Sequence, residues 1–215
     1  MKVVFVTPDE PDEKRLLPLA EEALEGGVDA VQLRLKGASA RDLFPLAKLL
    51  RESTDRAGAA LYVNDRADVA LAAGCAGVHL AGHSLPVAAA RAVLRPPFKI
   101  GVSCHSVAEA IQAETEGADY VYLGTVFPSP SKPGVSPVGL EELNRARREI
   151  RIPIIAIGGI TAENVGAVLS AGADGVAVIS AIAGRRSPRE AAQGLVDAFK
   201  SWKGERGPAL DVKGP

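Results

Sequence analysis

Two positive charges lie two residues apart in the segment Gln32-Leu33-Arg34-Leu35-Lys36. In an extended strand alternate side chains point to the same side, so Gln32, Arg34 and Lys36 would share one side. Two cations that point into the interior of a protein are costly unless an anion compensates them. A bound phosphate or pyrophosphate would supply that charge, whereas an ion pair such as Arg34 with Asp65 is the structural alternative.

The segment from Phe127 to Gly134 combines groups that suit phosphate oxygens. Ser129, Ser131 and Lys132 place two hydroxyls and one ammonium within four residues, and such donors bind phosphate. Three prolines in the same segment restrict its backbone. The alternative interpretation is an ordinary proline-rich surface loop.

A carboxylate, Asp65, directly follows Asn64 at the end of a short apolar run. Mg²⁺ prefers oxygen ligands and is often held by one or two carboxylates together with substrate phosphates and water. Asp65 is therefore a candidate Mg²⁺ ligand beside a pyrophosphate site. The alternative is a turn, because Asn and Asp side chains stabilise turns.

The elements that would position these groups recur along the whole chain. Short apolar runs of the kind found in strands buried on both faces occur eight times: Val3–Thr7, Ala30–Leu35, Ala60–Asn64, Gly77–Ala81, Lys99–Cys104, Tyr120–Val126, Pro153–Ile157 and Gly175–Ser180. Amphipathic segments that favour helices lie between or after them: Glu13–Gly26, Ala40–Arg56, Val87–Leu94, Val107–Glu116, Leu140–Glu149, Ala162–Ala171 and Pro188–Trp202. Several of these segments end in a glycine followed by Val-Asp, Cys-Ala or Ala-Asp, and glycine is common at helix C-termini.

Alternation of strand and helix predicts a parallel sheet, and eight such units favour closure into a single (β/α)8 TIM barrel. We assign residues 1–202 to this α/β barrel. The tail, residues 203–215, is rich in glycine, proline and charge, and we expect it to be flexible.

In a barrel of this type the active site forms where the carboxyl ends of the strands meet the loops that follow them. Gly158 and Gly159 follow the seventh expected strand, and Ile179 and Ser180 end the eighth. Adjacent glycines let the backbone approach a ligand closely, and the loops after strands seven and eight often hold a phosphate. Thr161 is placed to begin the helix that follows.

The histidines and cysteines give weaker indications. His79, His83 and His105 do not have the spacing of zinc ligands. His79 suits a hydrogen-bonded core histidine or a catalytic one, and the sequence leaves the roles of all three open. Cys104 alternates with Ser103, so we expect the cysteine to be buried rather than to act as a nucleophile.

Composition narrows the class of protein. The chain has 215 residues, of which 47% are hydrophobic and only 4% aromatic, so its core is expected to be mainly aliphatic. A net charge of −1 argues against a nucleic-acid-binding surface. Two cysteines without a CxxC pair favour a reducing cytoplasm. No apolar stretch reaches the roughly 18 residues that span a membrane.

Taken together, these segments resemble the thiamine phosphate synthase family over nearly the whole chain, from Val3 to about Ala198. The resemblance lies in Gln32–Lys36, Val63–Arg66, Gly77–Leu80, Ile100–Ser106, Gly117–Tyr120, Gly124–Lys132 and Ile157–Ile160. Enzymes of that family join hydroxymethylpyrimidine pyrophosphate to hydroxyethylthiazole phosphate and release pyrophosphate. The resemblance implies small phosphorylated substrates, a Mg²⁺ cofactor and a cytoplasmic enzyme, and it is compatible with a homo-oligomer.

The resemblance also implies a role for each candidate residue. The pyrimidine pyrophosphate would be bound by Gln32, Arg34, Lys36, Asn64, Ser103 and Lys132. Of these, Arg34, Lys36 and Lys132 would be catalytic, because they stabilise the charge of the leaving group. Asp65 would bind Mg²⁺. The thiazole phosphate would be held by Ser129, Ser131, Gly159, Ile179 and Ser180.

The chain departs from the family's pattern at three positions. Ser84 stands where the family commonly has a second acidic metal ligand, and Leu35 stands where the first motif usually has an acid. Both changes favour a TenI-like thiazole tautomerase as an alternative. Those enzymes use a histidine at the end of the sixth strand, however, and Thr125 occupies that position here. A protein that binds thiazole phosphate without turnover is the third hypothesis.

Overall fold

The computed structural model describes residues 2–82, 84–129 and 134–206, apart from the side chains of 203–206. Within these residues, eight parallel strands pair in sequence order, and β1 also pairs with β8, which closes the barrel. The strands are β1 (Val3–Val6), β2 (Ala30–Leu33), β3 (Ala60–Asn64), β4 (Gly77–Leu80), β5 (Lys99–Cys104), β6 (Tyr120–Leu123), β7 (Ile154–Ile157) and β8 (Gly175–Val178). The predicted (β/α)8 barrel is confirmed.

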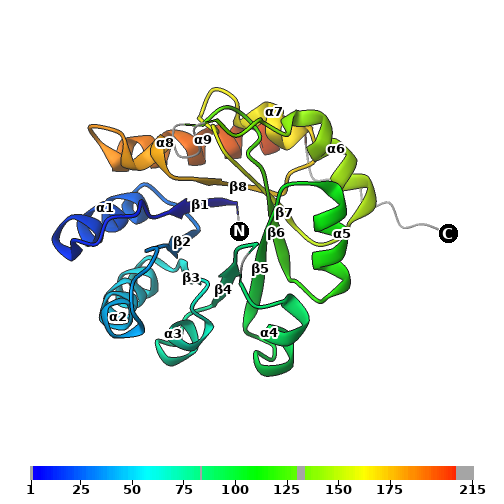
Figure 1. Ribbon diagram of the computed structural model, residues 1–215. Coiled ribbons are helices and arrows are strands. Elements are labelled where there is room, and N and C mark those ends of the chain that lie inside the picture. Colours follow the sequence, from blue (N-terminus) through cyan, green and yellow to red (C-terminus); the bar gives the residue numbers. More distant parts are fainter. Residues whose placement is uncertain (1, 83, 130–133, 207–215) are drawn as a thin grey trace.

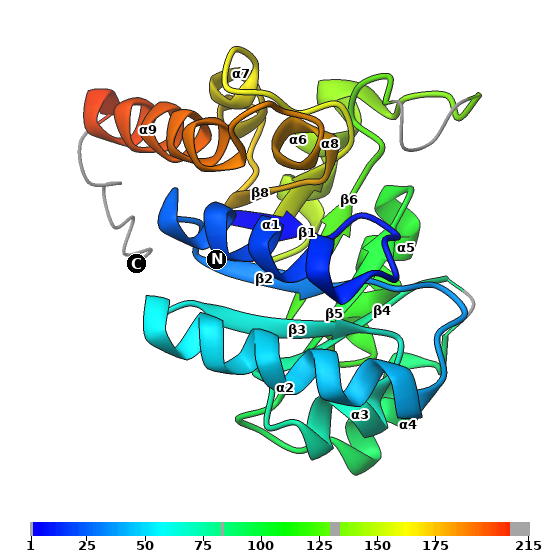
Figure 2. The same ribbon diagram turned by 90° about the vertical axis from the view of Figure 1, so that its left-hand side faces the viewer.

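The helices lie around the outside of the strands (Figure 1). They are α1 (Glu13–Glu25), α2 (Ala40–Ala57), α3 (Ala67–Ala72), α4 (Val87–Val93), α5 (Val107–Thr115), α6 (Gly139–Glu149), α7 (Val165–Ser170), α8 (Ser180–Ala183) and α9 (Pro188–Arg206). In the view of Figure 2, α1 and α2 run alongside β2 and β3. None of the helices in the described part of the chain has the length and apolar character required to cross a membrane.

The helices differ from the sequence prediction in three main ways. Two short helices, α3 and α8, were not predicted, because six and four residues are too few to show a helical period. Helix α7 begins at Val165 rather than at Ala162. Helix α9 continues to Arg206, beyond the expected end of the barrel at residue 202. The rest of the expected flexible tail, residues 207–215, lies outside the described residues.

The larger part of the core lies between the strands and the helices, and a smaller cluster fills the barrel itself. The inner cluster contains all three tyrosines of the chain together with small and branched residues: Val4, Val6, Ala30, Tyr62, Tyr120, Tyr122, Ile155 and Ala177. Gly101 makes room for one of these rings, because a Cβ there would lie 2.1 Å from Cζ of Tyr120. The core is mainly aliphatic as expected; its tyrosines lie inside the barrel, whereas Phe5 and Phe199 belong to the outer part.

In three of the recurring segments an aspartate stands two residues after the glycine. These segments stabilise the fold at the opposite end of the barrel from the predicted site. Gly27, Gly117 and Gly172 all have positive φ, a conformation that suits glycine at a helix C-terminus. The aspartate two residues after each glycine accepts a backbone N–H from the preceding strand. The pairs are Val3 with Asp29 at 2.9 Å, Ile100 with Asp119 at 2.8 Å, and Ile154 with Asp174 at 2.9 Å.

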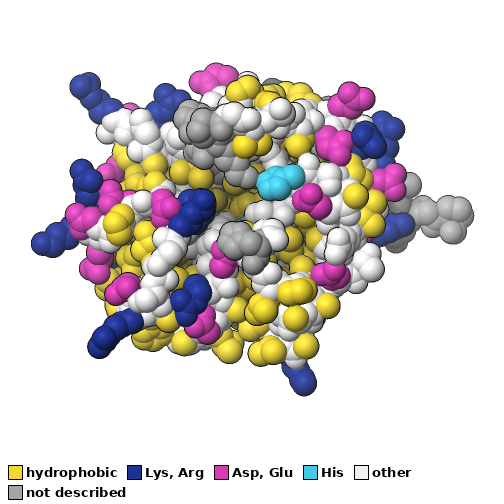
Figure 3. Space-filling model, in the orientation of Figure 1, with side chains coloured by type: hydrophobic (Ala, Val, Ile, Leu, Met, Phe, Trp, Pro, Cys, Tyr) yellow, Lys and Arg dark blue, Asp and Glu magenta, His cyan; other side chains and the backbone are white. Residues whose placement is uncertain are grey.

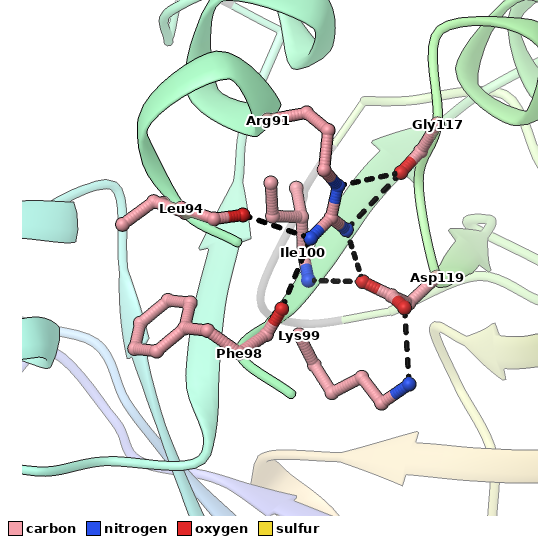
Figure 4. Close-up of polar contacts among 7 residues, drawn as sticks. All are labelled: Arg91, Leu94, Phe98, Lys99, Ile100, Gly117 and Asp119. Carbon is pink, nitrogen blue, oxygen red and sulfur yellow. Dashed lines mark hydrogen bonds and ion pairs between the residues drawn. The ribbon is translucent and has the colours of Figure 1, made fainter. Parts of the chain in front are cut away.

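Of these three aspartates, Asp119 accepts the most hydrogen bonds and lies at the centre of a cluster of polar contacts (Figure 4). Besides the Ile100 N–H, its carboxylate accepts Lys99 Nζ at 3.0 Å and Nη2 of Arg91. The Arg91 guanidinium also donates to the carbonyls of Leu94, Phe98 and Gly117. The cluster therefore ties the end of α4 and the start of β5 to the loop before β6, as Figure 4 shows.

We expect Asp119→Asn to lower the free energy of unfolding by about 1.5–3 kcal/mol near neutral pH, the range for hydrogen bonds to a charged group. Burial alone would raise the pKa of Asp119, but the Ile100 N–H, Lys99 and Arg91 outweigh burial and lower it. A carboxyl whose pKa is lowered by folding stabilises the fold above its unfolded-state pKa, and this contribution is lost as the pH falls through its folded-state pKa. The difference between wild type and variant should therefore shrink below about pH 4.

Urea unfolding between pH 3 and pH 8 measures this difference. Asp197→Asn is a suitable control, because Asp197 is exposed on α9 and its contact is with Gln193 of the same helix. A loss of stability in Asp119→Asn that is the same at every pH would contradict the electrostatic explanation.

Candidate active site

Side chains at the carboxyl ends of the strands surround a cavity of about 1370 Å³. The space-filling view shows this face hollowed at its centre, with Lys or Arg side chains beside the hollow (Figure 3). The cavity brings together predicted site residues that lie far apart in the sequence, namely Gln32, Arg34, Lys36, Asn64, Asp65, Ser103, Ser129, Gly159, Ile179 and Ser180. Two further predicted residues, Ser131 and Lys132, lie outside the described residues, as does His83.

A directed chain of hydrogen bonds crosses from β2 to the end of β3. Nε2 of Gln32 donates to Oδ1 of Asn64 at 2.9 Å, and Nδ2 of Asn64 donates to Oδ2 of Asp65 at 2.7 Å. A carboxylate only accepts hydrogen bonds, so Asp65 fixes the orientation of both amides. Three residues chosen from two separate motifs therefore form one connected unit.

Asp65 is held by the next strand as well. Its Oδ1 accepts the Ala81 N–H at 3.0 Å and the hydroxyl of Ser84, and its own N–H donates to the carbonyl of His79 at 2.9 Å. Its φ of 60° is in the left-handed region, which Asp and Asn enter more readily than most other residues. Ser84, which stands where the family commonly has an acid, thus supplies a hydrogen bond to the remaining carboxylate.

The two predicted cations do not lie on the strand, because β2 ends at Leu33. Side chains of the first βα loop replace the sheet hydrogen bonds: Thr7 Oγ1 accepts the Arg34 N–H at 2.9 Å and Asp9 Oδ1 accepts the Lys36 N–H at 2.8 Å. Both cationic residues still line the cavity. In the part of the chain that the structure describes, neither charged group pairs with a carboxylate, so the alternative ion pair of Arg34 with Asp65 is not formed.

His79 lies inside the barrel and is 1% exposed. Its Nε2 is 2.9 Å from Ser103 Oγ, and its Nδ1 is 3.4 Å from Tyr120 Oη. Burial lowers the pKa of His79 to about 3, against an opposing effect of Asp65. The imidazole is therefore neutral at pH 7, and it acts as a hydrogen-bonded core residue that orients Ser103 at the edge of the cavity.

His105 and Cys104 are the other candidates among the described residues. Nδ1 of His105 contacts the carbonyl of Gly124, and the backbone N–H of His105 donates to Glu109 Oε2 at 2.7 Å. Burial raises the pKa of the Cys104 thiol to about 12, so the thiolate is not available near neutral pH. Among the described residues, no group of three or more His, Cys, Asp or Glu side chains could hold a metal ion.

The two glycines after β7 allow two loops to pack closely. Gly158 and Gly159 have φ of 101° and 63°, and a Cβ on Gly159 would lie 2.5 Å from the carbonyl oxygen of Pro128. The glycines therefore hold the loop after β7 against the loop after β6, in addition to lining the cavity. Thr161 does not begin the next helix; Asn164 Oδ1 accepts its N–H at 2.9 Å.

Residues that the motifs did not indicate also line the cavity. Tyr122, on β6, and Arg185, which follows α8, are both in its wall. Tyr122 belongs to an apolar run in which no residue type marked the inward side, whereas Arg185 follows a helix too short to be recognised. Asp9 is missed for a similar reason, because its contact is with the backbone of another loop.

Comparisons with known proteins agree on one family. The family model described as thiamine monophosphate synthase matches residues 3–182. A thiamine-phosphate synthase from Methanoculleus marisnigri is 50% identical over 188 residues, which cover 87% of this chain and 89% of that protein. One from Chlorobium luteolum is 47% identical over 192 residues, 89% of this chain and 91% of that protein. The solved structure of thiamine phosphate pyrophosphorylase from Pyrococcus furiosus is 37% identical, with a TM-score of 0.84 over 94% of this chain and 96% of that one.

Proposed function

The chain belongs to the thiamine monophosphate synthase family, and on that premise we infer that the mouth of its barrel makes thiamine phosphate. The reaction joins hydroxymethylpyrimidine pyrophosphate to hydroxyethylthiazole phosphate and releases pyrophosphate. The observation that carries this inference is the cavity itself, whose lining includes two cations without a carboxylate partner among the described residues, a pair of glycines and a serine. Such a cavity suits two phosphorylated ligands at once.

The pyrophosphate of the first substrate would lie beside Arg34 and Lys36. Their charged groups are not used in ion pairs within the described chain, so they are available to an anion. Asn64 and Ser103 would add neutral hydrogen bonds, and Lys132 would add a third positive charge. The charge that develops on the departing pyrophosphate is then stabilised by groups already in place, the kind of preorganisation that lowers a reaction barrier.

The phosphate of the thiazole would lie in a separate part of the mouth, beside the loops after β7 and β8. Gly159 and the segment Ile179-Ser180 come from the loops after β7 and β8, the usual position of a phosphate in this fold. Ser129 and Ser131 would close the site from the loop after β6. Holding both substrates in one cavity makes the attack effectively unimolecular.

The chemical step then needs no covalent enzyme intermediate. The bond between the pyrimidine methylene carbon and the pyrophosphate oxygen breaks, and the pyrophosphate leaves with the electron pair. The thiazole nitrogen forms the new bond to the same carbon with its lone pair. The raised pKa of the Cys104 thiol and the neutral state of His79 are consistent with a site that positions reactants rather than attacking them.

We propose that Mg²⁺ is bound through Asp65. The donors of the site fit this ion, because they are oxygen atoms and the carboxylate is oriented by Asn64, Ala81 and Ser84. When bound, Mg²⁺ would neutralise charge on the pyrophosphate oxygens. Since Ser84 offers only a neutral oxygen, much of the coordination would come from the substrate, and binding without pyrophosphate should be weak.

The tautomerase alternative is not favoured. Thr125 stands where those enzymes use a histidine, it is 3% exposed, and the relatives that match over most of this chain are named synthases. A protein that binds thiazole phosphate without turnover has no need for the unit of Gln32, Asn64 and Asp65. A cytoplasmic location, a homo-oligomer and the absence of nucleic-acid binding remain predictions from the sequence.

The test is to incubate the pure protein with both substrates and Mg²⁺ and to measure thiamine phosphate and pyrophosphate. We expect the two products in equal amounts. Isomerisation of a thiazole phosphate tautomer alone, without pyrophosphate release, would support the tautomerase instead. Binding of thiazole phosphate with neither reaction would support the non-catalytic alternative.

A further inference from the structure

The floor of the mouth is built by four alternate strands. β2, β4, β6 and β8 supply Gln32, His79, Tyr122 and Ala177, all of which line the cavity. In this fold a layer of the barrel interior consists of four side chains from alternate strands. Within the layer the rings of His79 and Tyr122 lie against each other, with centroids 3.9 Å apart and planes inclined by 36°.

Two polar atoms of this floor have no hydrogen-bond partner within the described residues, Oε1 of Gln32 and Oη of Tyr122. Both residues are only 2% exposed. Buried polar atoms in folded proteins nearly always have a partner, because an unsatisfied one destabilises the fold. Both atoms belong to side chains that line the cavity, so a ligand lying on the floor can supply what the protein does not.

The neighbouring groups determine whether Oε1 of Gln32 and Oη of Tyr122 act as hydrogen-bond acceptor or donor. The Nε2 of Gln32 is already used, because it donates to Asn64, whose own amide donates to Asp65. Gln32 therefore presents an acceptor. Burial raises the pKa of Tyr122 far above its ordinary value, so its hydroxyl keeps its proton and can donate. The floor thus offers one acceptor and one donor beside the pair of rings that His79 and Tyr122 form.

We propose that the Tyr122 hydroxyl recognises the pyrimidine ring of the first substrate, beside Gln32, which the family resemblance already assigns to that substrate. This inference rests on the proposed function and adds to it a recognition residue that the sequence motifs did not indicate. The pyrimidine carries an exocyclic amino group next to a ring nitrogen, so one edge of the ring offers both a donor and an acceptor. The thiazole has no N–H group for Gln32, which favours the pyrimidine as the occupant.

The distinguishing variant is Tyr122→Phe, which removes one hydroxyl and keeps the ring that packs on His79. We expect the Kd and the KM for hydroxymethylpyrimidine pyrophosphate to rise about 3- to 10-fold, as for the loss of one hydrogen bond between uncharged groups. The KM for thiazole phosphate should stay within about two-fold of wild type. The melting temperature without ligand should be unchanged or higher, because an unpartnered buried hydroxyl is removed.

Tyr62→Phe is the matched control, because Tyr62 is also buried in the barrel but does not line the cavity. It should leave the Kd for hydroxymethylpyrimidine pyrophosphate unchanged. Calorimetry with hydroxymethylpyrimidine pyrophosphate alone keeps this test separate from turnover, so an inactive wild type that binds the pyrimidine would refute the synthase function but not the role of Tyr122. Wild-type affinity in Tyr122→Phe, or a selective rise in the KM for thiazole phosphate, would overturn the proposal. Failure of the wild-type protein to bind the pyrimidine would also overturn it.

Discussion

Replacing Asp65 with asparagine is expected to abolish Mg²⁺-dependent formation of thiamine phosphate in a protein that remains folded. The substitution removes the one carboxylate that we propose for the metal. It also disturbs the hydrogen-bond chain, because the nitrogen of the introduced amide would face a donor, either Nδ2 of Asn64 or the Ala81 N–H. The fold should survive, since asparagine tolerates the left-handed backbone at this position as well as aspartate does.

The measurement is turnover at saturating substrate over a range of Mg²⁺ concentrations, with the melting temperature as a check on folding. Asp68→Asn is the control, because Asp68 is an exposed residue three positions further on that pairs with Arg66. It should retain wild-type activity. Wild-type turnover and Mg²⁺ dependence in the folded Asp65→Asn variant would show that the metal is bound by other ligands.

The difference between Asp65 and Tyr122 illustrates how far the sequence predicts the site. Asp65 could be found because it interrupts an apolar run at its carboxyl end, where the barrel fold gathers ligand-binding groups. Tyr122 could not, because the run Tyr120-Val121-Tyr122-Leu123 is apolar on both sides and nothing in it marks the inward face. Only the closed barrel shows that alternate residues of β6 share the interior with His79.

Like the inward position of Tyr122, contacts between loops could not be predicted from the sequence. Ser84 was predicted as a substituted metal position, but its hydrogen bond to Asp65 depends on how the loop after β4 folds back over β3. The polar ends of the strands were predicted as parts of the strands, whereas β2 ends at Leu33 because Thr7 and Asp9 bond the backbone that follows. Local patterns therefore predicted the elements, and side-chain contacts between neighbouring loops set where they end.

Arg34→Ala is expected to lower kcat/KM for the pyrimidine pyrophosphate at least ten-fold, and as much as about 100-fold. A ten-fold loss corresponds to only ~1.4 kcal/mol of transition-state stabilisation, and one hydrogen bond to a charged group contributes about 1.5–3 kcal/mol. Because the thiazole phosphate is assigned to the loops after β7 and β8 rather than to the loop after β2, its KM should change little. Arg41→Ala removes the same charge from the exposed start of α2 and should retain wild-type kinetics.

Arg34→Lys separates charge from geometry, since lysine keeps the positive charge but lacks the planar fork that binds two oxygens at once. We expect its kcat/KM to lie between those of the wild type and the alanine variant.

A structural role for Arg34 makes a different prediction. If its guanidinium stabilised the fold, Arg34→Ala would lower the melting temperature while leaving kinetics intact in the folded fraction. The described chain gives the guanidinium no ion-pair partner to lose, so an unchanged melting temperature with reduced kcat/KM is the expected result. A variant that stays folded with wild-type kinetics would show that the pyrophosphate lies elsewhere.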